Sequence, residues 1–267
     1  MVAALREAGL YVTMIGDGVN DVPAMKAAHL AIAQGSGAQM AKSVADLILV
    51  TGDFTAVPTL VMEGRRILRN LQWVAKLFVS KSVFAAMLIL LVGIIPTGYP
   101  FLPRHLTLAA TVTIGIPGFF LALRASEGRW QVSDLLRDVA RFALPAGIAT
   151  GIGVLSSYAL SLNVLDLPLI DARTVAETSL VIIGLYLILA LEAGGQPRRT
   201  AVIGLCAIFM ALYSLVLIMP LTRDFFALAL PGTAILAAAV SGALVAIGGM
   251  WIANSSFVAG QRSRAQV

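Results

Sequence analysis

The sequence predicts a mixed fold: a partial α/β segment on the N-terminal side, followed by an all-α bundle of six transmembrane helices. Composition is the first reason, because 59% of the 267 residues are hydrophobic and only 12% are charged, whereas soluble domains contain about 25% charged residues. Up to about residue 70, short apolar runs alternate with helical stretches, as in α/β proteins. Beyond that point the chain has apolar runs near the roughly 20 residues that cross a bilayer.

The N-terminal segment, residues 1–53, is expected to contain three strands and two helices. Asp21 lies near the N-cap of the first helix, and Pro23 lies in its first turn, where proline costs no hydrogen bond. Because about 50 residues form too small a core for an independent domain, we expect this segment to complete a larger sheet. The predicted elements are a strand at 11–15, a helix at 22–29, a strand at 30–33, a helix at 36–45 and a strand at 46–50.

The rest of the chain is predicted to be helical. Residues 54–73 have helical periodicity with no breaker after Pro58, which predicts a stalk helix before a membrane domain at 74–253. Residues 254–267 are expected to form a cytoplasmic tail. The six predicted spans are 74–95, 105–124, 142–162, 174–193, 200–219 and 228–252.

The arginines between these spans predict the orientation of the chain. If residue 70 is cytoplasmic, only Arg104, Arg173 and Arg223 lie on the opposite side. Cytoplasmic loops of membrane proteins are enriched in Lys and Arg, so we expect a multi-pass protein of the plasma membrane, embedded in the lipid bilayer, with both termini cytoplasmic. The net charge of +5 comes from short clusters between apolar runs, so no nucleic acid is expected as a partner. The arginines on the predicted cytoplasmic side are Arg65, Arg66, Arg69, Arg124, Arg129, Arg137, Arg141, Arg198, Arg199, Arg262 and Arg264.

The string GDGVND, residues 16–21, follows a predicted strand and precedes a helix, where ligands bind in parallel α/β sheets. Gly16 and Gly18 allow a tight turn beside a ligand. Asp17 and Asp21 can converge on one hard cation with Asn20 beside them, and Mg²⁺ is commonly held by one or two carboxylates together with phosphate oxygens and water. The alternative is a capped turn, in which Asp21 caps the helix and Asp17 makes an Asx turn.

Three strings in this order resemble the hinge and stalk of P-type ATPases: GDGVNDVPAM at 16–25, AIAQGSG at 31–37 and EGRRILRNLQ at 63–72. The resemblance implies a partial haloacid-dehalogenase-like phosphorylation domain, and it extends over the six spans as membrane helices five to ten of a cation pump. The run at 100–123 looks like the actinobacterial calcium-uptake type. The implied reaction is phosphoryl transfer from ATP to an aspartate, followed by hydrolysis, which drives ion transport.

The same resemblance implies the roles of the loop residues. Asp17 is the expected Mg²⁺ ligand, with Asp21 as the second choice. Asn20 and Asp21 are expected to shape the catalytic site and to stabilise the phosphoryl group during transfer. Gly16 and Gly18 are expected beside the cofactor, which is Mg²⁺ with ATP as the substrate of the complete pump.

The chain departs from the family in what it does not contain. No D-K-T-G-T string, which carries the phosphorylated aspartate in the family, occurs in it. We therefore expect the C-terminal portion of a pump whose remaining domains belong to the same or a separate chain, and we expect no ATP hydrolysis by this portion alone. Two alternatives stay open: a catalytically incomplete membrane remnant or subunit that needs another chain, and a membrane-bound phosphatase of the haloacid dehalogenase superfamily.

The span at 105–124 contains a candidate ion path. Pro117 has no N–H to donate to the carbonyl of Thr113, and Gly115 loosens the same turn. The hydroxyls of Thr111 and Thr113 add further oxygens, and broken helices of this kind mark ion sites in transporters. The alternative is a packing kink, because Pro and Gly are frequent in membrane helices.

Ionisable residues are scarce in the other spans. Ser80 and Ser82 of the first span are also candidates for the ion path, and Lys81 between them either contributes to that path or extends to the cytoplasmic interface. The first two spans contain no carboxylate, and Glu177 and Glu192 are expected at the membrane interfaces. The sequence leaves the transported cation and the direction of transport open.

Overall fold

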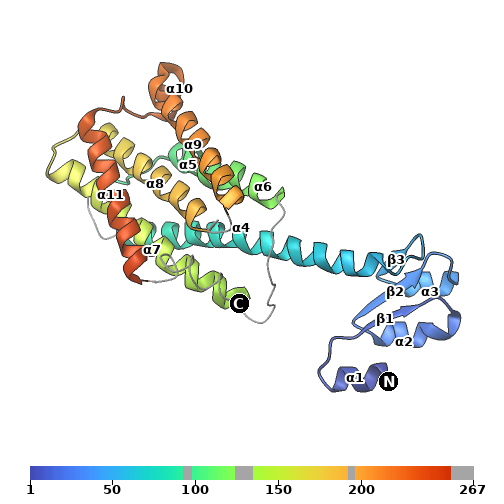
Figure 1. The fold of residues 1–267 in the computed structure, drawn as a ribbon. Coiled ribbons are helices and arrows are strands. Elements are labelled where there is room, and N and C mark those ends of the chain that lie inside the picture. Colours follow the sequence, from blue (N-terminus) through green and yellow to red (C-terminus); the bar gives the residue numbers. More distant parts are fainter. Residues whose placement is uncertain (93–97, 124–134, 192–195, 254–267) are drawn as a thin grey trace. The chain divides into compact units, whose positions relative to one another are not determined.

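The computed structural model describes residues 1–92, 98–123, 135–191 and 196–253 and divides the chain into two compact units, Met1–Arg65 and Arg66–Val267 (Figure 1). The division falls within helix α4 (Ala56–Val92), which covers most of both the predicted stalk and the predicted first span. The predicted tail, Glu192 and the arginines at 124, 129, 198, 199, 262 and 264 lie outside the residues, or the side chains, that the structure describes.

The first unit is the expected α/β segment. Strands β1 (Thr13–Gly16), β2 (Leu30–Gln34) and β3 (Leu47–Leu49) form a parallel sheet in the order β1-β2-β3. Helix α2 (Val22–Ala27) follows β1 and α3 (Gln39–Val44) follows β2, while the short helix α1 (Val2–Glu7), which the sequence did not predict, precedes the sheet.

A small apolar core holds this sheet to its helices. Met25 of α2 and Ala41 of α3 pack with Ala31 and Ala33 of β2. Because residues two apart on a strand point to the same face, α2 and α3 cover one face of the sheet. Asp46 fixes the start of β3, since its carboxylate accepts the Ala31 amide at 2.8 Å and its own amide donates to the Ala31 carbonyl at 2.9 Å.

Strand β1 begins two residues later than predicted. The Tyr11 side chain is 75% exposed and stacks on the ring of His29, with 4.5 Å between ring centroids. The amide of Val12 donates to Nδ1 of His29 at 3.2 Å. This aromatic pair therefore occupies the chain before the sheet, and pairing starts at Thr13 opposite Leu30.

The second unit is helical. Among the described residues, five helices are long and apolar enough to cross a membrane: Ala56–Leu91, Leu136–Asn163, Leu169–Leu191, Thr200–Ile218 and Thr233–Ala253. They correspond to five of the six predicted spans. The helices that carry the last four are α7 (Leu135–Asn163), α8 (Leu169–Leu191), α9 (Gln196–Ile218) and α11 (Thr233–Ala253), with the short α10 (Pro220–Phe226) between α9 and α11.

The remaining predicted span, 105–124, is helical but is not one uninterrupted α-helix. It consists of α5 (Pro103–Ala110), the π-helical segment η2 (Thr111–Gly115) and α6 (Ile116–Leu123). The amide of Ile116 donates to the carbonyl of Thr111, five residues back, and Pro117 has no amide hydrogen to restore the α pattern. The predicted break is therefore present, as a wide turn immediately before Pro117.

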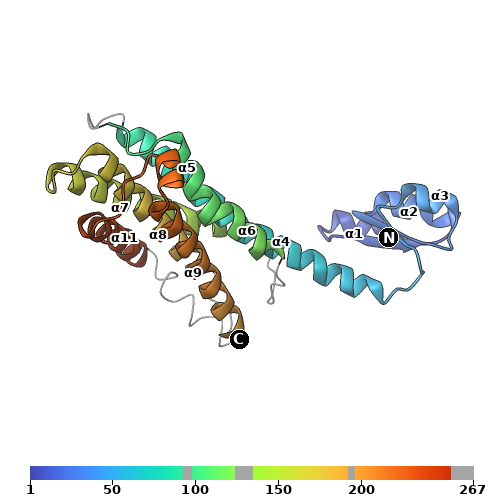
Figure 2. The same cartoon turned by 90° about the horizontal axis from the view of Figure 1, so that it is seen from above.

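Helices α7, α8 and α11 pack side by side in both views (Figures 1 and 2). A Cβ atom on Gly153 of α7 would lie 2.4 Å from the carbonyl oxygen of Gly242 on α11, so the two backbones approach as closely as small residues permit. Ser179 of α8 joins all three, because its hydroxyl lies 3.0 Å from the Ser157 hydroxyl of α7 and 3.1 Å from the Ala239 carbonyl of α11.

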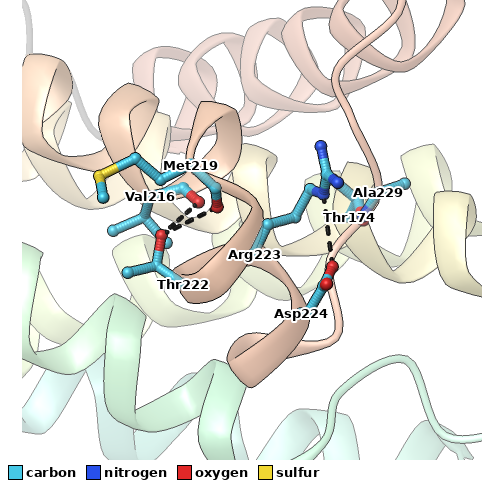
Figure 3. A network of polar contacts seen from close by, with 7 residues as sticks. All are labelled: Thr174, Val216, Met219, Thr222, Arg223, Asp224 and Ala229. Atoms are coloured by element: carbon cyan, nitrogen blue, oxygen red, sulfur yellow. Dashed lines mark hydrogen bonds and ion pairs between the residues drawn. The ribbon is translucent and has the colours of Figure 1, made fainter.

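The segment around α10 ties α5 to α8. The Arg104 guanidinium donates to the Phe225 carbonyl at 2.7 Å, and the fully buried His105 contacts the Phe226 carbonyl through Nε2 at 2.8 Å. On the other side, the Ala229 amide donates to Oγ1 of Thr174 on α8 at 2.7 Å. Figure 3 shows Thr174 and Ala229 of this second contact. It also shows the Thr222 hydroxyl, which donates to the Val216 and Met219 carbonyls, and the Arg223–Asp224 ion pair at 3.6 Å.

Candidate functional site

The loop after β1 is organised by the carboxylate of Asp21. Its Oδ2 accepts hydrogen bonds from the amides of Asp17 and Gly18, both at 3.1 Å. Asp21 is the N-cap residue of α2, as predicted, but its carboxylate bonds backward to the loop and makes no capping hydrogen bond to its own helix. The loop is therefore held from within by two backbone donors.

Two glycines permit this packing. A Cβ atom on Gly16 would lie 2.6 Å from the Cβ of Asp21, and one on Gly37 would lie 2.7 Å from the carbonyl oxygen of Asp17. The Ala38 amide donates to the same carbonyl at 2.7 Å, so the loop after β2 closes against the loop after β1. Gly18 is less constrained, because a Cβ there would lie 3.6 Å from Asp21 Oδ2.

The loop contains two further polar side chains, those of Asp17 and Asn20. Both are exposed, and within the described ranges neither side chain has a hydrogen bond or ion pair. Asp17 therefore does not make the Asx turn of the alternative interpretation. Its carboxylate and the Asn20 amide lie at the carboxyl ends of parallel strands, where ligands bind in α/β sheets.

These residues fit Mg²⁺ as a partial ligand set. An exposed carboxylate with no internal partner is a suitable oxygen ligand, and Mg²⁺ keeps waters and phosphate oxygens as its other ligands. The described residues contain no group of three His, Cys, Asp or Glu side chains able to hold a metal. Asp17 is thus the side chain that would hold the ion, while Asp21 already uses one oxygen inside the loop.

In the helical unit, a cavity of about 50 Å³ lies between α4, α5, η2, α7 and α8. Its wall is mostly apolar, and four polar side chains reach it: Ser80 and Lys81 from α4, Thr113 from η2 and Thr150 from α7. Thr113 is only 5% exposed and packs on α8, since a Cβ on Gly184 would lie 2.6 Å from the Cβ of Thr113.

The structure does not bring all the predicted ion-path residues to this cavity. Thr111 and Gly115 are exposed and line a shallow groove on the outer side with Lys81. Ser82 is exposed, and its hydroxyl donates to the Phe78 carbonyl at 3.1 Å. Pro117 is buried but does not line the cavity. The cavity residues that the sequence predicted are therefore Ser80 and Thr113, together with Lys81.

Glu177 is more buried than the sequence predicted, because its side chain is 0% exposed and neither carboxyl oxygen has a hydrogen-bond partner among the described residues. Its expected position at the membrane interface stays a prediction. A lone ionisable residue within an apolar run is the sequence signal that could have identified it. Thr150 carried no such signal, since threonine is common in membrane helices.

A second polar cluster joins α4 to α7. Nζ of Lys76 lies 2.6 Å from the Asp138 carboxylate and 5.8 Å from the centre of the Phe142 ring, and Gln72 also donates to Asp138. Lys76 is buried, and the nearby Asp138 carboxylate compensates its positive charge. The sequence did not predict this cluster, because its residues on α4 are 62 or more residues from its residues on α7.

Several known proteins similar to this chain are calcium- or cation-transporting ATPases. The chain is 33% identical over 238 residues to the calcium-transporting ATPase CtpE of Mycolicibacterium smegmatis, which covers 85% of this chain and 30% of that protein. It is 40% identical over 168 residues to CtpE of Mycobacterium bovis, covering 59% of this chain and 21% of that protein. The probable cation-transporting ATPase exp7 of Streptococcus pneumoniae is 28% identical over 163 residues, covering 58% of this chain and 21% of that protein.

These matches fix the relationship and its extent. No protein-family model matches the chain. The chain spans between 21% and 30% of the length of the relatives described above. Over the part that it spans, the chain is homologous to the calcium-transporting P-type ATPases.

Proposed function

We propose that the chain is the C-terminal portion of an ATP-driven cation pump of the plasma membrane, with calcium as the transported ion. The observation that carries the proposal is the match to a calcium-transporting ATPase over 85% of the chain. The order of elements supports it, since a parallel α/β segment with an acidic loop precedes helices able to cross a membrane. We infer that α5, η2 and α6 together form a sixth span.

In the proposed pump the loop after β1 is one wall of the phosphoryl-transfer site. Asp17 binds Mg²⁺, which when present neutralises charge on the transferring phosphoryl group. Asp21 holds the amides of Asp17 and Gly18, so the loop keeps its shape when the ligand leaves. We expect the exposed Asn20 amide to donate to a phosphoryl oxygen. The aspartate that receives the phosphoryl group and the nucleotide site belong to the remaining domains, in the same or a separate chain.

The experiment is ATP-driven ⁴⁵Ca²⁺ uptake into proteoliposomes by the complete pump, with phosphoenzyme formation measured in parallel. Asp17→Asn should abolish phosphoenzyme formation and uptake, because the amide cannot supply the charge that holds Mg²⁺. Glu7→Gln is the matched control, since Glu7 is an exposed carboxylate of the same unit outside the loop, and it should leave both activities unchanged. Normal turnover by Asp17→Asn would contradict the assignment.

Each alternative function predicts a different experimental result. Hydrolysis of p-nitrophenyl phosphate by the purified chain alone would favour a membrane-bound phosphatase. A gene with no D-K-T-G-T sequence in frame or in a neighbouring frame would favour a catalytically incomplete remnant. Uptake that requires a second, separately encoded chain would favour a subunit of a divided pump.

A further inference from the structure

His105 is fully buried between α5 and α10, and both nitrogens of its ring are in use. Nδ1 accepts the Leu102 amide at 3.2 Å. Nε2 lies 2.8 Å from the Phe226 carbonyl oxygen, which can only accept a hydrogen bond. The ring is therefore the neutral imidazole, with its single proton on Nε2.

The same ring closes the first turn of α5. Leu102 is the N-cap residue of this helix, and His105 occupies its third position. The His105 amide donates to the Leu102 carbonyl at 2.9 Å, while the Leu102 amide donates back to the ring, as in a capping box. Glutamate or glutamine usually makes the contact from this position. In this chain a side chain that titrates near neutral pH makes it.

Through its other nitrogen the ring joins α5 to α10. Beside it, the Arg104 guanidinium donates to the Phe225 carbonyl at 2.7 Å. Helix α5 continues directly into η2, which carries Thr113 to the cavity. Two neighbouring side chains therefore hold the starting point of the broken helix, and one of the two can gain a proton.

A second proton on the ring has no acceptor in this arrangement. It would be on Nδ1, facing the Leu102 amide, so that two donors would oppose each other. The positive end of the helix dipole lies at the same turn, and the charges of Arg104 and Arg173 act on the ring. A buried imidazolium in such surroundings is costly. Proton binding therefore favours a form in which the ring has left this place.

The carboxylates of the neighbouring elements do not compensate such a charge. Asp224 of α10 pairs with Arg223 at 3.6 Å, and the Glu177 carboxyl of α8 lies beside the backbone of Ala109, one turn beyond His105. Within the part of the chain that the structure describes, no carboxylate forms an ion pair with the ring. The other titratable groups around this turn are Lys81 of α4, Tyr99 before α5, Tyr158 of α7, Asp171 of α8 and Tyr213 of α9.

We propose that His105 is a positioning residue that acts as an acid-sensitive clamp, made of its contacts with Leu102 and Phe226. The neutral ring holds the start of α5 to α10. When Nδ1 gains a proton from water, the hydrogen bond from Leu102 is lost and the clamp opens. Helix α5 then no longer fixes η2 and the Thr113 oxygen at the cavity, so acid lowers transport. This last step rests on the proposed pump function, which also puts His105 on the membrane side opposite the ATP.

The test measures hydrogen exchange of the full chain in lipid nanodiscs from pH 7.5 to 4.5, corrected for the intrinsic rates. Imidazole in water gains its proton near pH 6.5, so peptides covering residues 102–106 and 225–229 should lose protection up to about tenfold per pH unit below that value. His105→Gln is the conservative variant, because glutamine can accept the N-cap amide and donate with its own amide but cannot gain a proton. It should stay protected down to pH 4.5.

His29 supplies the matched control. The chain contains two histidines, and His29 accepts the Val12 amide at Nδ1 in the first unit. His29→Gln should keep the full acid response at α5. In that variant, ¹⁵N-labelled histidine gives the ring signals of His105 alone, which should change from the Nε2–H form to the imidazolium as protection is lost.

Three results would overturn the proposal: an equal acid response in the wild type and His105→Gln, a His105 ring that stays neutral down to pH 4.5, or a ring that is protonated without loss of protection. The two results on the ring need no substitution at position 105, so they hold even if His105→Gln does not fold.

Failure of this inference differs from failure of the proposed function. In proteoliposomes of the complete pump, acid on the side opposite the ATP should reduce ⁴⁵Ca²⁺ uptake by the wild type, whereas His105→Gln should stay active. If both proteins transport Ca²⁺ with the same pH profile, the pump function stands and the role of the clamp in transport falls. If the complete protein transports nothing with ATP but acid releases α5 only when His105 is present, the clamp stands and the pump function falls.

Discussion

Gly16 and Asp21 are in such close contact that a Cβ atom on Gly16 would lie 2.6 Å from the Cβ of Asp21. Strand β1 therefore ends directly against the residue that closes its loop. Because Asp21 accepts the amides of Asp17 and Gly18, the conformation that leaves Asp17 exposed depends on the absence of a side chain at position 16.

The first prediction concerns this contact. Gly16→Ala should displace the Asp21 carboxylate and cost about 1–3 kcal/mol of stability in the first unit, as overpacking typically does. The amides of Asp17 and Gly18 should lose protection in hydrogen exchange. Gly18→Ala is the control, because its Cβ would meet only an ordinary contact at 3.6 Å. Unchanged protection in Gly16→Ala would show that the loop does not depend on this glycine.

The second prediction concerns the cavity. Thr113→Val keeps the shape of the side chain but removes its hydroxyl oxygen, so it should raise the cation concentration for half-maximal ATPase activity of the complete pump about tenfold, equivalent to about 1.4 kcal/mol. Thr107→Val is the control, since Thr107 precedes η2 on the exposed side and its hydroxyl donates to the Pro103 carbonyl. An unchanged cation dependence would leave the wide turn as a feature of packing only.

The third prediction concerns the contact between α7 and α11. A Cβ atom on Gly242 would lie 2.6 Å from the Gly153 carbonyl oxygen, so Gly242→Ala should force the helices apart and lower the stability of the helical unit by about 1–3 kcal/mol. Thermal unfolding in detergent measures this change. In the control, Gly248→Ala on the same helix, the added methyl group meets no atom within 4 Å, so the melting temperature should not fall.

The fourth prediction concerns pH. Hydrogen bonds from the side chain and the amide of Thr55 hold the pKa of Asp53 below its ordinary value, and the amide donates to Oδ1 at 2.9 Å. A lowered folded-state pKa adds stability above the unfolded value of about 3.9 that is lost as the pH falls through the folded value. The start of α4 should therefore exchange amide hydrogens faster at low pH, after correction for the intrinsic rate. Asp53→Asn should show no such pH dependence, and an equal dependence in both proteins would contradict the assignment.

Much of the first unit follows from local sequence pattern. The alternation of strands and helices, the parallel sheet and Asp21 at the start of α2 were predicted, because each depends on residues close together in the chain. The late start of β1 was not, since it arises from Tyr11 stacking on His29, 18 residues later. The Asp21 carboxylate bonds to the loop instead of its own helix, and that choice depends on the space left at Gly16.

In the helical unit, hydropathy predicted where the helices lie in the sequence but not which helices pack against one another. The predicted span 174–193 placed Glu177 near its beginning, whereas α8 starts at Leu169 and carries Glu177 about two turns from its first residue. Burial then depends on how α5, α9 and the segment after α10 close around that turn, which no local pattern encodes. Pro117 predicted a break in this helix. The close packing of Thr113, at that break, against Gly184 of α8 depends on the tertiary structure and could not be predicted.

The wide turn at Thr111–Gly115 determines how far this helix would move if the turn became regular. A π turn holds one residue more than the regular turn it replaces, and each residue of an α-helix accounts for about 100° of rotation and about 1.5 Å of rise. If that extra residue is taken up into regular geometry, the helix on one side of the turn rotates and advances by one such step while its other side stays fixed to α10 through Arg104 and His105. The π turn beside the cavity therefore defines the size of such a step, because the backbone geometry sets both the rotation and the rise.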